Sequence, residues 1–151
     1  MIKTKLYLDT TVSSAYYDAR SPDRQRLTRQ FWSERLLDFE ATISTIVLSE
    51  IRDTPDVGIR EKMEKLVMWF DILESNEETD ALAQEYVRRG IFSEKQTPDA
   101  NHTAIAVVNG ISYFASWNFK HLVKVNTRRE VNLVNMLMGY DSIEIVAPPE
   151  L

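Results

Sequence analysis

Hydrophobic and polar positions follow two alternating periods along the chain, one typical of strands and the other of helices. Five short runs rich in β-branched and aromatic residues predict strands, over residues 5–9, 41–45, 70–73, 111–115 and 143–146. Between them, apolar residues recur every three or four positions and predict helices, over 27–39, 46–53, 59–70, 82–90, 97–109 and 131–138. Because strands and helices alternate, the pattern predicts an α/β fold: a three-layer α/β/α arrangement with a five-stranded, mostly parallel sheet.

Local sequence signals mark several helix ends. Thr97-Pro98-Asp99 combines a capping threonine, a proline in the first turn and an acid at the positive end of the helix dipole. Gly110 is the predicted stop of that helix. Asp9 stands directly before Thr10, where a further helix is expected to begin, so a capping role alone would explain this acid.

The composition indicates an ordinary globular chain. Its 151 residues and 17.5 kDa predict one domain over 1–151, without linker or repeat. Cysteine is absent, which excludes a disulfide scaffold, a thiolate metal site and a cysteine nucleophile. No apolar run approaches the roughly 18 residues of a membrane span. The lysines near the N-terminus are not followed by an apolar stretch of the length found in signal peptides. We therefore expect a soluble, cytoplasmic protein that does not contact membranes.

Charge is unevenly distributed along the chain. The formal net charge of −5 argues against general attraction to nucleic acid, which is typical of basic domains. The segment 100–129, however, contains no acid and carries both histidines, His102 and His121, besides four cations, Lys120, Lys124, Arg128 and Arg129. This segment suits a local phosphate contact, although ordinary variation along a surface would also explain it. Another cationic run, Arg20, Arg24, Arg26 and Arg29, is diluted by acids and interpreted as a solvated helix face, with RNA contact as the less favoured alternative.

Four oxygen-bearing side chains follow the predicted strands or begin the neighbouring helices: Asp9, Glu50, Asp99 and Asn118. In an open parallel sheet, ligands bind at the carboxyl ends of the strands, so we expect these side chains to meet at one edge. Hard cations such as Mg²⁺ and Mn²⁺ need oxygen ligands of this kind. The pattern therefore predicts a divalent-cation site that acts on a phosphate ester.

Each of these residues also has a structural interpretation. Glu50 fits a solvated helix position, Asp99 fits a helix-dipole role, and Asn118 fits a turn or a cap. His102 lies in a largely apolar helical stretch, which favours a histidine packed in the core over a ligand. The three tryptophans are interpreted as core or interface residues and not as platforms for bases.

Four segments in order resemble the PIN-domain family, most of all the VapC-like toxins of type II toxin–antitoxin systems. They are Leu6-Tyr7-Leu8-Asp9-Thr10-Thr11-Val12, Ser44-Thr45-Ile46-Val47-Leu48-Ser49-Glu50-Ile51, Pro98-Asp99-Ala100-Asn101-His102-Thr103-Ala104-Ile105-Ala106 and Phe114-Ala115-Ser116-Trp117-Asn118-Phe119-Lys120-His121-Leu122. The resemblance implies a five-stranded α/β/α fold and hydrolysis of RNA phosphodiester bonds in an acidic pocket holding Mg²⁺ or Mn²⁺. By the same resemblance Asp9, Glu50 and Asp99 are the metal ligands.

The chain departs from the family at the fourth site position, where Asn118 replaces a common aspartate. An amide oxygen still ligates a cation, but the lost charge weakens attraction for it. Besides these four catalytic candidates, hydroxyl groups and cations are the candidate RNA contacts: Thr10, Ser116, Lys120, His121, Arg128 and Arg129. The resemblance also implies a small antitoxin as partner and a homodimer.

Two other functions compete with a metal-dependent ribonuclease. A PIN-like module that binds RNA or protein without catalysis would explain Asn118. A phosphoacceptor domain on a flavodoxin-like sheet also expects an acid after the first strand. That class needs an acidic pair there and a lysine after the last strand, where this chain has Ala147-Pro148-Pro149.

Overall fold

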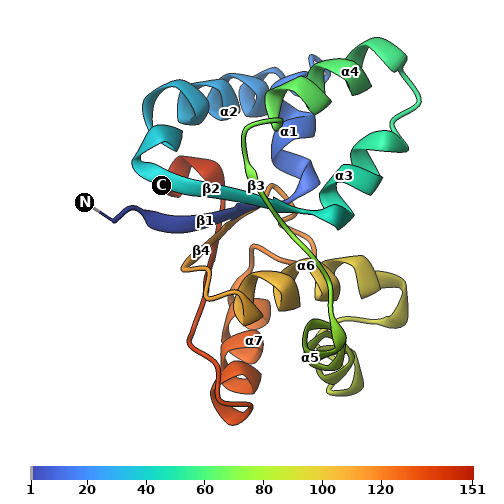
Figure 1. Ribbon diagram of the computed structural model, residues 1–151, viewed down its shortest axis with the longest axis vertical. Coiled ribbons are helices and arrows are strands. Elements are labelled where there is room, and N and C mark those ends of the chain that lie inside the picture. Colours follow the sequence, from blue (N-terminus) through green and yellow to red (C-terminus); the bar gives the residue numbers. More distant parts are fainter. Residues whose placement is uncertain (1) are drawn as a thin grey trace.

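The computed structural model describes residues 2–151 and contains one sheet of five parallel strands (Figure 1). The strands are β1 (Thr4–Leu8), β2 (Phe39–Ser44), β3 (Asp71–Leu73), β4 (Tyr113–Ala115) and β5 (Glu144–Val146), in the order β3-β2-β1-β4-β5. In the register, Tyr7 of β1 lies opposite Thr42 on one side and Phe114 on the other. The predicted strands are confirmed, and the sheet is parallel throughout.

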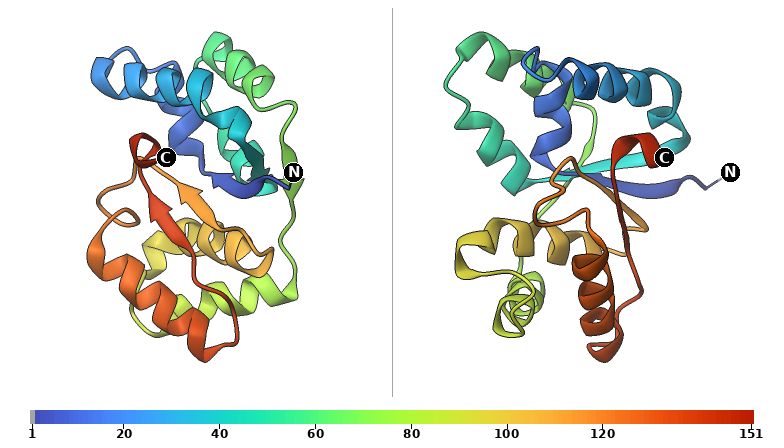
Figure 2. Two further views of the ribbon diagram at one scale, coloured as in Figure 1. Left: turned by 90° about the vertical axis from the view of Figure 1, so that its left-hand side faces the viewer. Right: turned by 180° about the vertical axis from the view of Figure 1, so that it is seen from behind.

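Helices cover both faces of the sheet, as predicted for a three-layer arrangement. One face carries α1 (Thr10–Tyr16), α2 (Pro22–Glu34), α3 (Thr45–Arg52) and α4 (Val57–Leu66), and the other carries α5 (Glu77–Arg88), α6 (Thr97–Val108) and α7 (Val125–Leu137) (Figures 1 and 2). Three 3₁₀ turns, Leu36–Asp38, Glu94–Gln96 and Pro148–Glu150, connect or follow these elements. None of the helices in residues 2–151 has the length and apolarity needed to cross a membrane.

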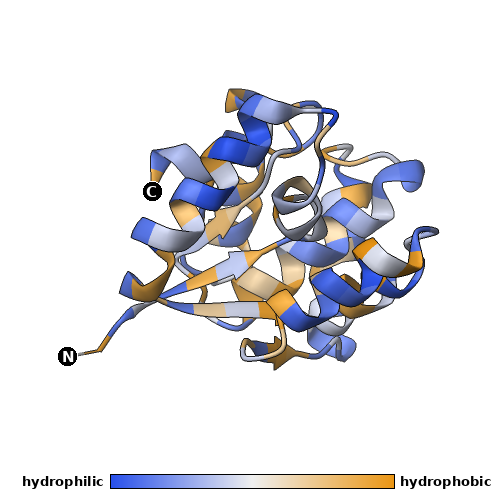
Figure 3. Cartoon of the chain, turned by 90° about the horizontal axis from the view of Figure 1, so that it is seen from above, coloured by the Kyte–Doolittle hydropathy of each residue, from blue (hydrophilic) through white to orange (hydrophobic). Residues whose placement is uncertain are grey.

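The central strands form the core because helices exclude water from both of their faces. Leu6 and Tyr7 point to opposite faces of β1, and both are fully buried. Phe114 of β4 is equally buried and packs against Tyr7, with ring centroids 5.1 Å apart. Figure 3 shows hydrophobic residues concentrated on the strands and hydrophilic residues on the outer faces of the helices.

The chain order creates a switch point beside β1. The chain runs outward from β1 through β2 to β3 and then returns to place β4 on the free side of β1. Ligands of open α/β sheets bind at the carboxyl ends of strands where the order reverses in this way. The order differs from the 2-1-3-4-5 arrangement of flavodoxin-like sheets, so the phosphoacceptor hypothesis is wrong at the level of topology.

Several predicted boundaries were wrong. α2 begins at Pro22, five positions before the predicted start, because its polar first turns carry no apolar stripe. α7 begins at Val125, before the predicted stripe. The capping role assigned to Thr97 was also wrong: Gln96 is the N-cap of α6, and Thr97 lies inside the first turn with its hydroxyl donating to the Glu94 carbonyl at 2.6 Å. Gly110 ends α6 as predicted, with φ of +71° that an L side chain rarely adopts.

Candidate active site

Asp9 follows the last residue of β1 and is held there by four hydrogen bonds. Its carboxylate accepts three of them, and its backbone N–H donates the fourth. Its Oδ1 accepts from the backbone N–H of Thr11 at 3.0 Å, which caps α1, and from the Thr11 hydroxyl. Its Oδ2 accepts from Ser116 Oγ at 2.6 Å, and its own N–H donates to the Ala115 carbonyl at 3.4 Å. Asp9 is only 4% exposed. The capping role of Asp9 is therefore confirmed, and the same contacts fix the carboxylate at the switch point.

The protonation of Asp9 reflects a balance between burial and its donors. Burial raises the pKa of Asp9 above its ordinary value, because a charge loses water there. The neighbouring His102 ring and the donors Ser116 and Thr11 lower the pKa in part. A cation at this edge would relieve the cost of an ionised, buried carboxylate.

Glu50 lies in the second turn of α3 and points to the same edge. Its Oε1 accepts from Thr10 Oγ1 at 2.9 Å and from His102 Nε2 at 2.6 Å, while its side chain remains 40% exposed. Partial burial works to raise the pKa of Glu50, but the hydrogen bond and the charge of His102, with the Thr10 hydroxyl, hold it below its ordinary value. Glu50 is therefore ionised at neutral pH.

His102 connects Glu50 to the centre of the sheet through a buried chain of hydrogen bonds. Because a carboxylate has only acceptors, Nε2 of His102 carries the proton that it shares with Glu50. On the other side of the ring, Nδ1 lies 2.5 Å from the Tyr7 hydroxyl oxygen, which in turn lies 2.8 Å from Ser44 Oγ. Burial raises the pKa of Tyr7 well above its usual range, so this hydroxyl keeps its proton. The burial predicted for His102 is confirmed, at 3% exposure.

Asp99 lies in the first turn of α6 and faces the loop after β4. Its Oδ1 accepts from Asn118 Nδ2 at 3.4 Å. Burial raises the pKa of Asp99, and the charge of Glu50 adds to this, while His102, His121 and Asn118 lower it in part.

Asn118 links the β4 loop to the acids. Its backbone N–H donates to Ser116 Oγ at 3.0 Å, and its Oδ1 accepts from the N–H of His121 at 2.9 Å. Ser116 in turn donates to Asp9, so a continuous set of contacts runs from Asp9 through Ser116 and Asn118 to Asp99. Asn118 therefore serves as the turn residue that its sequence context suggests and also contacts an acid.

Hydrogen bonds at this edge thus link the four candidate catalytic residues in two sets. One set joins Asp9, through Ser116, to Asn118 and Asp99, and the other joins Thr10 to Glu50. The two sets meet because Asp9 and Thr10 are adjacent in the chain. Among residues 2–151, no group of three or more histidine, cysteine, aspartate or glutamate side chains is placed to hold a metal ion by itself. The donors are all oxygens, which suits Mg²⁺ or Mn²⁺. Mg²⁺ in particular is commonly bound by one or two carboxylates completed by water and substrate phosphate, so the residues present fit such an ion.

The candidate RNA contacts divide between the edge and more distant positions. Thr10 and Ser116 contact the acids directly. The ring of His121 lies against Gln96, with Nδ1 2.7 Å from the Gln96 amide nitrogen, close enough to Asp99 to lower its pKa. Arg128 Nη1 instead points to the Ile145 carbonyl at 3.5 Å, and Arg129 is exposed on α7. No hydrogen bond within the described part of the chain joins either of these arginines to the acids.

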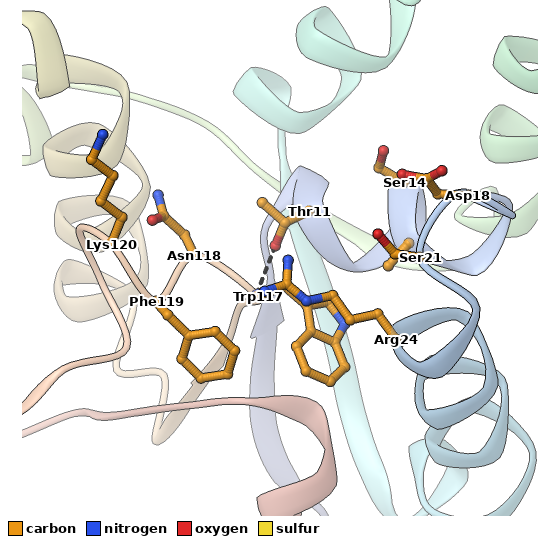
Figure 4. A pocket seen from close by; sticks show the side chains of 10 residues that line it. Thr11, Ser14, Asp18, Ser21, Arg24, Trp117, Asn118, Phe119 and Lys120 are labelled. Atoms are coloured by element: carbon orange, nitrogen blue, oxygen red, sulfur yellow. Dashed lines mark hydrogen bonds between the residues drawn. The ribbon is translucent and has the colours of Figure 1, made fainter.

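A pocket of about 510 Å³ opens beside the acids, between α1, α2 and the β4 loop (Figure 4). Thr11 and Asn118, which contact Asp9 and Asp99, line it on one side. Arg24, Phe119 and Lys120 also line it, so Lys120 is the one candidate RNA contact of the sequence analysis found there.

Two residues of this region were not assigned a site role from the sequence. Thr11 holds Asp9 and also accepts from the N–H of Trp117 at 2.9 Å, so it fixes β1 to the β4 loop. His102 was considered a core residue, yet it is also the closest partner of Glu50. Two sequence signals point to His102: it lies in the acid-free segment 100–129, and its position three residues after Asp99 places both near one face of α6.

The chain is similar to known proteins in its fold and not in its sequence. No family model matches the sequence, and no curated protein matches it. Among solved structures, the chain is similar to VapC20 of Mycobacterium tuberculosis, described as a toxin that cleaves the sarcin-ricin loop, with a TM-score of 0.55 and 18% identity over 73% of this chain and 87% of that one.

Two solved complexes give similar results. A toxin–antitoxin complex from Klebsiella pneumoniae matches with a TM-score of 0.60 and 16% identity, covering 82% of this chain and 94% of that chain. VapBC2 from Rickettsia felis, bound to a DNA fragment from its promoter, matches with a TM-score of 0.54 and 13% identity over 78% and 90% of the two chains. The chain therefore has the PIN-like fold of VapC toxins, as the sequence predicted.

Proposed function

We propose that this protein is a metal-dependent endoribonuclease that hydrolyses RNA phosphodiester bonds. The observation that carries the proposal is the set of contacts from Asp9 through Ser116 and Asn118 to Asp99 at the switch point of a PIN-like sheet. On this fold, such an edge is the place where a ligand binds. The similarity in fold to VapC toxins supports the proposal.

Mg²⁺ or Mn²⁺ is the proposed cofactor, held by Asp9 and Asp99. Glu50, which the resemblance makes a third ligand, is proposed to lie beside the ion instead, because no three such side chains of residues 2–151 are placed to hold one ion. When bound, such an ion lowers the pKa of water and stabilises the charge that develops on phosphate. Ser116 and Thr11 hold the Asp9 carboxylate in one orientation, which reduces the reorganisation that ligation requires. His102 keeps Glu50 ionised, so that Glu50 can accept a hydrogen bond from the attacking water.

The proposed substrate is single-stranded RNA with its backbone along this edge. Lys120 and His121, which follow Asn118, supply cationic or donor groups for phosphate, and the hydroxyls of Thr10 and Ser116 lie beside the acids. Arg128 and Arg129 are proposed to contact RNA farther along α7, where screening makes their effect weaker. The substrate implies that the protein acts in the cytoplasm.

Cleavage of a labelled single-stranded RNA tests the proposal. We expect cleavage with Mn²⁺ or Mg²⁺ that stops in EDTA, and a loss of at least about 100-fold for Asp9→Asn and Asp99→Asn, because each removes a charge from the ion. Glu64→Gln, an exposed acid on α4, is the matched control and should retain full activity. Cleavage that survives Asp9→Asn would overturn the assignment.

A catalytically weakened module that binds RNA or protein is the second candidate. Two observations favour it: Asn118 occupies the fourth site position, and no three acids of residues 2–151 are placed around one ion. In this case the wild type binds RNA without cleaving it, and Asn118→Asp restores cleavage. The first candidate predicts that the wild type is already active.

We also propose a small antitoxin as partner, and a homodimer as the form of the protein. Two of the similar structures are toxin–antitoxin complexes. A segment of the partner that enters the acidic edge would compete with RNA for the same groups. Light scattering of the purified chain, alone and with the product of a neighbouring gene, tests both proposals, and a monomer that binds no such product would contradict them.

A further inference from the structure

Arg24 extends from α2 toward the β4 loop and rests on two aromatic rings. Its guanidinium carbon lies 5.4 Å from the centroid of Trp117 and 5.5 Å from that of Phe119. Trp117 is buried and donates from Nε1 to Thr28 Oγ1 at 2.9 Å, so α2 and the β4 loop are fixed relative to each other. The position of the Arg24 side chain is therefore set by the fold even though the residue lies at the surface.

The polar groups of this guanidinium are unused. Within residues 2–151 the Arg24 side chain donates no hydrogen bond and forms no ion pair, in contrast to Arg20 and Arg29 on either side. Cation–π contacts use the charge of a guanidinium but none of its five N–H groups. Arg24 therefore presents a fixed positive charge with free donors, the arrangement that binds phosphate in a bidentate manner.

These donors lie at the pocket that borders the acids (Figure 4). Asp18 is the one acid lining the pocket, and Arg20 neutralises it through hydrogen bonds at 2.9 and 3.2 Å. Lys120 adds a second cation, and Ser14 and Ser21 add hydroxyl groups. In a chain with net charge −5, the pocket is a local exception that suits an anion.

The rings of the pocket provide a second kind of contact. Phe119 is 47% exposed, so part of its ring is accessible to a nucleobase. Stacking on an aromatic side chain tolerates any base, whereas phosphate contacts fix the path of the backbone. A phosphate with an adjoining base matches this combination better than a free anion or acidic side chains do, because neither of these stacks on the ring.

We infer that this pocket binds the nucleotide next to the scissile phosphodiester of a single-stranded RNA, with its phosphate on Arg24 and Lys120 and its base on Phe119. The inference rests on the proposed function for the identity of the substrate. Thr11 and Asn118 line the pocket and contact Asp9 and Asp99, so the RNA would pass directly from the pocket to the acids. Arg24, for which the sequence favoured a solvated helix face over RNA contact, is thereby assigned to substrate binding.

Fluorescence anisotropy with a labelled single-stranded RNA of about 12 nucleotides tests the inference in EDTA, where cleavage plays no part. Arg24→Gln removes the charge, and Arg26→Gln is the matched control on the same helix, likewise exposed and outside the pocket. We expect Arg24→Gln to weaken binding about 5- to 10-fold and to reduce the slope of log Kd against log salt by about 0.7. Arg26→Gln should change the affinity less than about 2-fold.

Phe119→Leu separates stacking from charge, because it keeps an apolar side chain and the net charge. We expect weaker binding by about 5-fold or more with an unchanged salt slope. Equal effects of Arg24→Gln and Arg26→Gln, or failure of the wild type to bind RNA at about 50 mM salt, would overturn the inference. If RNA binding depends on Arg24 and Phe119 in this way but the RNA is not cleaved with Mn²⁺, the nuclease proposal is wrong and the pocket assignment still holds.

Discussion

Nε2 of His102 donates to Oε1 of Glu50 at 2.6 Å, and this contact joins a fully buried ring to a half-exposed carboxylate. The ring is fixed on its other side by the Tyr7 hydroxyl, itself in contact with Ser44. The orientation of Glu50 is therefore determined from the centre of the sheet and not by the surface of α3. A buried polar chain of this kind is costly unless every member is satisfied, and in residues 2–151 no buried side-chain polar atom lacks a partner.

Replacing His102 with Leu should destabilise the fold and release Glu50. We expect a loss of about 2 kcal/mol in urea unfolding at neutral pH, because the Tyr7 hydroxyl and Glu50 lose a partner together. Tyr7→Phe, which leaves the contact between His102 and Glu50 in place, should cost about 1 kcal/mol. Equal stability of the His102→Leu variant and the wild type would contradict the role assigned to this chain of hydrogen bonds.

The same contact predicts a pH dependence. The pKa of Glu50 is lowered in the folded state, so its contribution to stability is present above the ordinary glutamate pKa of about 4.3 and is lost as pH falls through the lowered folded value. His102→Leu should remove this part of the acid sensitivity. Urea midpoints from neutral pH down to about pH 3 check this, and parallel curves for the two proteins would contradict it.

The contribution of Asp99 to stability changes with pH in the opposite direction. Burial raises its folded pKa, so its contribution to stability is fully present below about pH 4 and is lost as pH rises through the raised value. In metal-free buffer at neutral pH, we therefore expect Asp99→Asn to raise Tm by about 1–2 °C, with the gain disappearing near pH 4. Glu64→Gln, a substitution of an exposed acid, should leave Tm unchanged throughout. A Tm for Asp99→Asn below that of the wild type at neutral pH would refute this account.

Asn118 is the position at which metal affinity can be changed most directly. Asn118→Asp replaces an amide that donates to Asp99 with a like charge, so we expect a lower Tm without metal and an affinity for Mn²⁺ raised about 10-fold. The variant keeps an acceptor for the His121 N–H. Titration calorimetry measures the affinity, with Asn118→Ala as the control that removes the amide without adding charge. An unchanged affinity in Asn118→Asp would place Asn118 outside the metal site.

The strands, and the positions of the acids relative to them, were predictable because both depend on local patterns. Hydrophobic runs with β-branched residues identify strands, and alternation with helices makes the sheet parallel, which brings strand ends such as Asp9 and Ser116 to one edge. α2 was placed too late because a helix that begins with polar turns and a proline shows no apolar period there.

The connections between those residues were not predictable. Whether Asn118 points to Asp99, or His102 to Glu50, depends on how α6 and the β4 loop pack, which no spacing in the sequence encodes. The contact between Arg24 and Trp117 was not predictable either, because it requires α2 and the β4 loop to meet. A single sequence therefore indicates which residues are candidates for the site more readily than it indicates their hydrogen-bond partners.

Anomalous diffraction from crystals soaked in Mn²⁺ tests the central claim most directly, namely that the carboxylates of Asp9 and Asp99 share one divalent cation. The account predicts a single strong peak between β1 and α6, with oxygens of both residues at about 2.0–2.2 Å. A peak at another part of the chain, or no peak while both carboxylates keep the contacts with Ser116 and Asn118 seen here, would contradict it.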